Sequence, residues 1–185
     1  MKEIPRLFSG KMVQAILKGW KTQTRRVVKF PADYDGKSVW SNGIYGIKYS
    51  SNEFEGCVKR LSAKWQIGDL LWVRESSCKN NTQTGWPYMY KASEETHYVN
   101  HIKWKPSIHM PKAAARIWLE VTNVRAERLQ DISEEDAKAE GIESWIDAID
   151  NFKQLWQSIN GQENWEANPW VWVVEFKVLS TTGKP

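Results

Sequence analysis

The spacing of apolar residues along the chain predicts three amphipathic helices. Residues 11–19 gather their apolar side chains on one face, with Ser9 placed to cap the first turn and Gly19 placed to end the helix. Residues 133–140 begin at a serine that can also act as a helix cap. Residues 145–159 repeat the helical pattern and stop at an Asn-Gly pair.

Three further segments have the pattern of β-strands. A turn at 68–69 leads into LLWVRE, the apolar run that closes the segment 65–75. Residues 116–128 alternate apolar and polar side chains, and residues 170–179 form a run rich in Val and Trp. Because strands and helices do not alternate regularly, we expect an α+β fold. It would be a mostly antiparallel sheet or small β-barrel flanked by helices, not a doubly wound sheet.

The length of 185 residues suits a single domain, which we place at residues 1–180. Two segments, near 31–64 and 77–109, are expected to be insertions in this domain. The second is polar and aromatic and lacks a regular apolar period, so we expect it either to help select a ligand or to cover the sheet surface. The final residues, 181–185, are expected to form a loose tail.

Composition adds two features to this outline. Trp is unusually frequent, with 12 residues, which implies a core rich in flat rings or aromatic platforms for a planar ligand. The net charge of +4 is mild, but it is unevenly distributed. Residues 1–30 carry eight Lys/Arg and one Glu, whereas residues 127–150 carry nine Asp/Glu and two Lys/Arg. The first segment is therefore a candidate basic patch and the second a candidate acidic helix.

Several kinds of site lack their usual residues. His97 and His101 stand four apart, a spacing that zinc ligands on a helix can have, but no Cys lies near them. We therefore interpret them as solvent-exposed histidines and expect no metal site. Cys57 and Cys78 form no CxxC motif, and phosphate-loop, dinucleotide and common hydrolase motifs are missing, so no cofactor is expected. No apolar run approaches the ~20 residues of a membrane helix, and no secretory signal is evident. We expect a soluble, cytoplasmic protein without a membrane partner.

The segment GWKTQTRR, which follows the first helix, is the strongest candidate for chemistry. Lys21 and Thr24 are three apart, so they would project to the same side if the turn continued helically. A lysine held among Trp rings would be desolvated, and neutral lysine can take the proton of a threonine hydroxyl. Spacing alone favours a simpler interpretation, in which Lys21, Arg25 and Arg26 form a basic helix end stabilised by the helix dipole.

The same segment also resembles a known family. Gly19, Lys21 and Arg26 match the GxKxxxxR signature of the ASCH family, which has a PUA-like barrel fold, and the surrounding sequence resembles its longer phage and prophage members. Three later segments resemble family strands and a helix in the expected order: IGDLLWVRE, RIWLEVTNVRAERLQDISEEDAKAEGI and VWVVEFKVL. The resemblance covers roughly half of the chain. It implies a PUA-like small β-barrel with two insertions.

The resemblance also implies an activity. Some small ASCH proteins are metal-independent amidohydrolases that remove the acetyl group from N4-acetylcytidine. Their catalytic Lys and Thr match Lys21 and Thr24, and their Glu matches Glu140, with Glu75 at the end of LLWVRE as the rival carboxylate. We therefore expect Lys21, Thr24 and Glu140 to be catalytic, acting on a nucleoside or modified base.

The rival interpretation is a non-catalytic RNA-binding module of phage or prophage origin, because PUA-like domains also bind RNA. Trp20 can stack a base, and Arg25 and Arg26 can hold a phosphate beside it. Arg74 can act in the same way from the barrel, and Glu75 is also a candidate substrate contact. These residues fit either function, and the oligomeric state is left open.

Overall fold

The structure is a computed structural model. It describes residues 1–29, 39–40, 46–48, 58–60, 63–79, 87–93, 102–144 and 146–185, with only the backbone described at 39–40, 46–48 and 58–60. Among these residues, no helix is both long enough and apolar enough to cross a membrane. The first predicted insertion, 31–64, lies largely outside the described residues, and the second, 77–109, lies partly outside them. Cys57, His97 and His101 also lie outside them.

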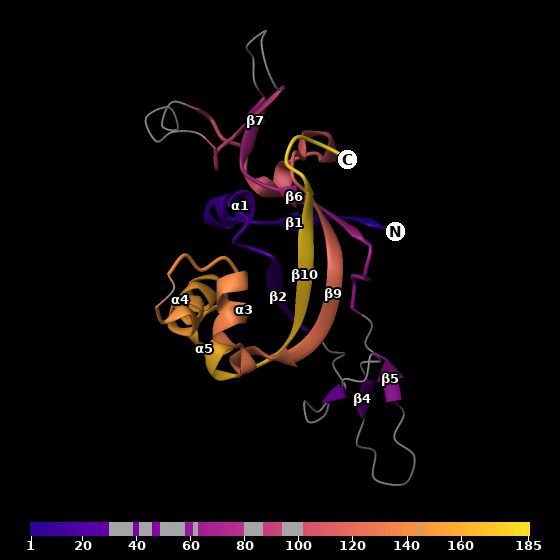
Figure 1. Ribbon diagram of the computed structural model, residues 1–185, viewed down its shortest axis with the longest axis vertical. Helices are drawn as coiled ribbons and strands as arrows, with labels where there is room; N and C mark the ends of the chain where they lie inside the picture. The colour runs from indigo at the N-terminus through magenta and orange to yellow at the C-terminus, as the bar shows by residue number, and fades with distance from the viewer. Residues whose placement is uncertain are drawn as a thin grey trace.

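A five-stranded sheet forms the centre of this mixed α/β fold (Figure 1). Its strand order is β1-β6-β9-β10-β2, with β1 parallel to β6 and the other neighbours antiparallel. The long strands β9 and β10 lie side by side and curve together across the molecule. The strands of the sheet are β1 (Glu3–Leu7), β2 (Gln23–Val27), β6 (Leu70–Arg74), β9 (Trp118–Arg128) and β10 (Trp170–Ser180).

Helices cover both faces of this sheet. The α-helices are α1 (Gly10–Leu17), α3 (Glu134–Ala139), α4 (Ala148–Asn160) and α5 (Gln162–Glu166). Val13 and Ile16 of α1 are buried in one apolar cluster with Val174 of β10. Val173, the preceding residue of β10, points the opposite way and packs with Phe152 of α4 in a second cluster. The sheet therefore separates two apolar cores.

Smaller elements complete the described chain. A three-stranded sheet has the order β3-β4-β5, and β7 pairs with β8. These strands are β3 (Val39–Trp40), β4 (Gly46–Lys48), β5 (Val58–Arg60), β7 (Ser77–Lys79) and β8 (Tyr88–Tyr90). The short 3-10 helices are η1 (Ser107–His109), η2 (Lys112–Ala114) and η3 (Leu129–Asp131).

The predicted helices and strands are largely confirmed. Ser9 accepts a hydrogen bond from the Met12 amide at the start of α1, and Ser133 accepts one from the Asp136 amide at the start of α3. β6, β9 and β10 lie where the strand patterns placed them, and α4 begins three residues later than expected. The sequence pattern did not predict β1 or α5. In β1, Pro5 interrupts the apolar run, and α5 is only a short helix that follows Gly161.

The expected closed barrel is not found in the described part of the chain. β1 and β2 occupy opposite edges of the sheet and are not paired with each other. The physical reason is α1, which connects them and packs with Ile4 of β1 and Val28 beyond β2 in the same cluster. An apolar helix thus fills the space that pairing between the edge strands would close.

The expected loose tail makes two contacts with the body of the protein. The Gly183 amide donates to the Arg116 carbonyl oxygen at 2.9 Å. The Lys184 ammonium is 2.9 Å from a carboxylate oxygen of Glu3. These contacts tie residues 183–184 to β1 and to the residues just before β9.

Candidate functional site

The segment after α1 is a strand, not the helical turn that the Lys21–Thr24 spacing assumed. Gly19 has φ of +76°, a left-handed conformation that ends the helix. Lys21 then forms an isolated antiparallel bridge with Glu140, and the Thr22 amide donates to the Ala139 carbonyl oxygen at 2.9 Å. A helical turn does not form here, because the backbone of this segment pairs with β10 and with the end of α3 and is therefore extended.

Lys21 is completely buried. Its Nζ donates to the Glu140 carboxylate at 2.8 Å and to the Glu140 backbone oxygen at 2.6 Å. The Phe8 ring centroid lies 5.9 Å from the same atom. Burial lowers the pKa of Lys21 below its ordinary value, while the negative charge of Glu140 acts in the opposite direction. The sequence predicted desolvation by Trp rings, but the aromatic neighbour is Phe8.

Thr24 is buried in β2. Its Oγ1 has no hydrogen-bond partner among the described residues. Thr24 pairs with Val174 across the sheet, so its side chain faces the cluster that contains Phe8 and Val174. A buried hydroxyl without a partner costs about 1–3 kcal/mol, so packing does not explain why a threonine is used here.

Glu140 is the carboxylate that the fold brings to Lys21. It follows α3 directly as its C-terminal capping residue and is 5 % exposed. Its second carboxylate oxygen accepts from Arg25 Nη1 at 3.2 Å. The rival, Glu75, is instead held by Arg116 through two hydrogen bonds of 2.8 and 2.9 Å. The structure thus pairs Lys21 with Glu140 and places Glu75 in a different ion pair.

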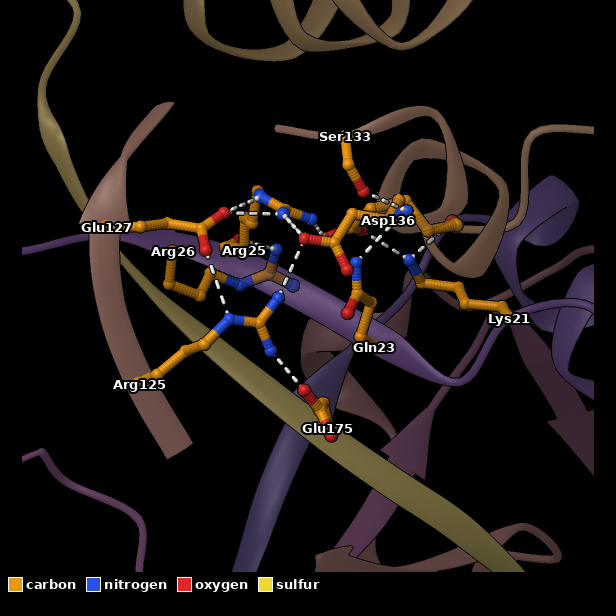
Figure 2. A network of polar contacts seen from close by, with 10 residues as sticks. Lys21, Gln23, Arg25, Arg26, Arg125, Glu127, Ser133, Asp136 and Glu175 are labelled. Carbon is orange, nitrogen blue, oxygen red and sulfur yellow. Dashed lines mark hydrogen bonds and ion pairs between the residues drawn. The ribbon is translucent and has the colours of Figure 1, made fainter. Parts of the chain in front are cut away.

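A network of ion pairs extends from this site along β2 and β9 (Figure 2). Arg25 is buried and donates through all three guanidinium nitrogens, to carboxylates of Glu127, Asp136 and Glu140. Arg125 donates to Asp136 at 2.7 Å and also contacts Glu127 and Glu175. Arg25 also lines the larger of the two cavities described below, so its predicted role as a substrate contact stays a prediction. Its hydrogen bond to Glu140 helps to hold that carboxylate in place.

Gln23 and Asp136 attach α3 to this network. Gln23 Nε2 donates to the Asp136 backbone oxygen at 2.7 Å. Burial alone would raise the pKa of Asp136, but Arg25 and Arg125 outweigh it and hold that pKa below its ordinary value. Asp136 therefore stays ionised at neutral pH and fixes the end of the helix that leads to Glu140.

Two cavities meet at Glu140. The larger, of about 520 Å³, is also lined by Arg6, Phe8, Arg26 and residues of α4. The smaller, of about 420 Å³, is lined by Trp20 and by residues of α1 and 141–144. Volumes of this size are typical of small-molecule sites. Lys21 and Thr24 line neither cavity, so Glu140 is the member of the predicted catalytic set that faces both.

The remaining predicted contacts are distributed around these cavities. Trp20 is 43 % exposed, and its ring lies 4.4 Å from Lys18 Nζ. Arg26 lines the larger cavity and donates to the Arg25 and Leu7 backbone oxygens at 2.9 and 3.4 Å. Arg74 lines neither cavity and donates to the Ile108 backbone oxygen. Trp20 and Arg26 are therefore placed beside a cavity, and Arg74 is not.

Sequence reasoning missed Arg6 and Phe8, which both line the larger cavity. The available signal was the local excess of Lys/Arg in residues 1–30, which pointed to the segment but not to a residue. No cluster of three or more His, Cys, Asp or Glu suited to a metal ion occurs among the described residues. The polar groups at the site are thus amines, guanidiniums, a hydroxyl and carboxylates.

Comparisons with known proteins found similarity in solved structures. A scan against protein-family models and a search of curated proteins gave no match. The fold is similar to an ASCH domain from Lactobacillus crispatus JV V101, with 17% identity, a TM-score of 0.46, and coverage of 97% of this chain and 80% of that one. It is also similar to a DUF984 protein from Enterococcus faecalis V583, with 11% identity, a TM-score of 0.45, and coverage of 100% and 85%.

Proposed function

We propose that the protein is an ASCH-type amidohydrolase that removes an acyl group from a modified nucleobase, most simply the acetyl group of N4-acetylcytidine. The observation that carries the proposal is the buried Lys21–Glu140 pair beside two cavities. The unpartnered hydroxyl of Thr24 in the same region of β2 supports it. A buried lysine of lowered pKa paired with a carboxylate is an arrangement typical of functional sites.

The proposed chemistry starts with one proton transfer. Lys21 gives a proton to Glu140 across the 2.8 Å hydrogen bond, which produces a neutral amine and a carboxylic acid. Neutral Lys21 takes the hydroxyl proton of Thr24 as Oγ1 attacks the acetyl carbonyl carbon. The C–N bond then breaks, and Glu140 donates its proton to the departing N4 amine. Protonated Lys21 then passes its proton to the Glu140 carboxylate across the same hydrogen bond, and neutral Lys21 takes a proton from the water that attacks the acetyl-Thr24 ester. The ester C–O bond breaks, Glu140 returns its proton to Thr24 Oγ1, and acetic acid is released and ionises to acetate.

Substrate access involves Phe8. This side chain lines the larger cavity, and its ring centroid lies 5.9 Å from Lys21 Nζ. For attack, Lys21 Nζ and Thr24 Oγ1 must come within about 2.6–3.2 Å of each other. Both groups border the cluster that contains Phe8, so a shift of that ring on substrate binding would open the path and allow this approach.

The test is an assay of the pure protein with N4-acetylcytidine, followed by chromatography for released cytidine. We expect turnover by the wild type and its loss in Lys21→Met and Thr24→Val. Thr22→Val is the matched control, because Thr22 is exposed and joins the sheet through backbone atoms. No cytidine at high enzyme concentration would reject the substrate. Activity that survives Lys21→Met would reject the mechanism.

A second candidate function, RNA binding without catalysis, is favoured by one observation. Arg6 and Arg26 line the same cavity, and no ion pair among the described residues includes either of them. Phosphate contacts by arginine release counterions, so RNA affinity would fall steeply with rising salt. A salt-independent affinity, or no RNA binding at low salt, would remove this candidate.

A further inference from the structure

Two arginines without carboxylate partners lie at one side of the larger cavity. Arg6, in β1, and Arg26, in β2, come from opposite edges of the sheet and meet at the opening that α1 covers. Arg26 Nη2 donates to the Leu7 backbone oxygen at 3.4 Å and so spans the two edges. The two cations thus lie at the side of the sheet where the edge strands β1 and β2 do not pair.

Arg6 contacts an aromatic ring, but two of its guanidinium nitrogens have no hydrogen-bond partner among the described residues. Its Cζ lies 4.2 Å from the Trp65 ring centroid, a cation–π contact. Nε and Nη2 are buried and have no hydrogen-bond partner among the described residues. Burial and, to a smaller extent, the charge of Arg26 lower the pKa of Arg6. These are the features of a cation that lacks its counterion.

Arg26 has hydrogen bonds but no close negative charge. Among the described residues, its two hydrogen-bond acceptors are backbone oxygens, of Arg25 and Leu7. Glu140 attracts it from a longer distance, while burial lowers the pKa of Arg26. A partly buried guanidinium without a counterion is unfavourable, so two neighbouring cations of this kind favour an anion that binds between them.

We propose that Arg6 and Arg26 form a phosphate-binding subsite, so that the ligand of the larger cavity is a nucleotide rather than a free nucleoside. Arginine suits this role because its planar fork matches phosphate oxygens. The 520 Å³ volume agrees with a ligand of this size.

The rest of the cavity fits the other parts of a nucleotide. One wall is apolar and comes from α4, through Phe152, Leu155, Trp156 and Ile159. Such a wall suits the flat face of a base or ribose, and Glu140 lines the same cavity. The identification of the base rests on the proposed function, whereas the preference for phosphate rests on Arg6 and Arg26 alone.

Calorimetric titration with cytidine and cytidine 5′-monophosphate tests the subsite directly. We expect the wild type to bind the monophosphate roughly tenfold or more tightly than cytidine. The ratio should fall toward one in Arg6→Gln and in Arg26→Gln. Arg128→Gln is the matched control, because Arg128 also stacks on a tryptophan, at 4.7 Å from Trp170, but does not line the cavity. Thermal melting of each variant checks that it is folded.

The outcomes separate the possible sources of phosphate. A short oligocytidylate that binds more tightly than the monophosphate, with the same loss in Arg6→Gln, would support the subsite and assign it to RNA phosphodiesters. Equal affinity for cytidine and its monophosphate would overturn the subsite, as would a preference that survives both substitutions. A phosphate preference without hydrolysis of N4-acetylcytidine would reject the amidohydrolase and leave the subsite standing.

Discussion

Lys21 Nζ donates to two oxygens of Glu140, the carboxylate at 2.8 Å and the backbone carbonyl at 2.6 Å, across a sequence separation of 119 residues. Both side chains are almost fully excluded from water. The contact attaches the segment after α1 to the end of α3 and joins the two cavities at Glu140. Stability and activity should therefore both depend on this pair.

We predict that Lys21→Met destabilises the protein by about 3–5 kcal/mol, because it leaves Glu140 buried with one cation fewer. Chemical denaturation measures the change. The double variant Lys21→Met/Glu140→Gln should be less destabilised than the sum of its single variants, since it removes the unpaired charge. Additive effects of the two substitutions would show that the pair is not coupled.

Thr24→Val should separate stability from activity. The hydroxyl has no hydrogen-bond partner among the described residues, so an isosteric methyl group should leave the free energy of unfolding unchanged or raise it by about 1 kcal/mol. Turnover of N4-acetylcytidine should nevertheless be abolished. Thermal melts and the cytidine assay are measured on the same preparation. A clear loss of stability would instead indicate that the hydroxyl has a structural partner.

Gly141→Ala should be far more harmful than Gly19→Ala. Both glycines have positive φ, +90° and +76°, so each substitution carries backbone strain of about 1–2 kcal/mol. At Gly141 the added Cβ would also lie 2.9 Å from the Cβ atoms of Ala15 and Lys21, whereas nothing lies within 4 Å at Gly19. Overpacking adds about 1–3 kcal/mol and displaces Lys21. Equal melting temperatures for the two variants would contradict this packing.

The contribution of Asp136 to stability should disappear in acid. Its folded-state pKa is held below the ordinary value of 3.8, because Arg25 and Arg125 outweigh the effect of burial. The unfolded state then binds more protons, so stability from this group is complete above 3.8 and is lost as pH falls through the folded pKa.

The pH effect is measured by comparing Asp136→Asn with the wild type in denaturant unfolding over a pH series. The difference in stability should be largest near neutral pH and should shrink in acid. Asp131→Asn serves as the control, because Asp131 is exposed and takes no part in the ion pairs of the network among the described residues. A difference that stays constant with pH would contradict the assigned role of Asp136.

The sequence was sufficient to predict those helices and strands that depend on residues close together in the chain. Ser9 and Ser133 cap helices through contacts three residues away, and the apolar runs of β6, β9 and β10 form strands as their patterns predict. The family resemblance also predicted Lys21, Thr24 and Glu140 as catalytic residues, which stays a prediction, and the structure pairs the first with the third. These features could be found because helix caps, side-chain alternation and short motifs depend on neighbours along the chain.

The contacts between residues that are distant in the sequence became known from the three-dimensional structure. The choice of Glu140 over Glu75 depends on which carboxylate the fold brings to Lys21, and the pairing of Arg6 with Arg26 depends on an opening between two edge strands. The structure also replaced the expected helical turn at Lys21 with a strand. Contacts between distant segments have no local pattern in the sequence, because they are set by how the sheet, α1 and α3 pack together.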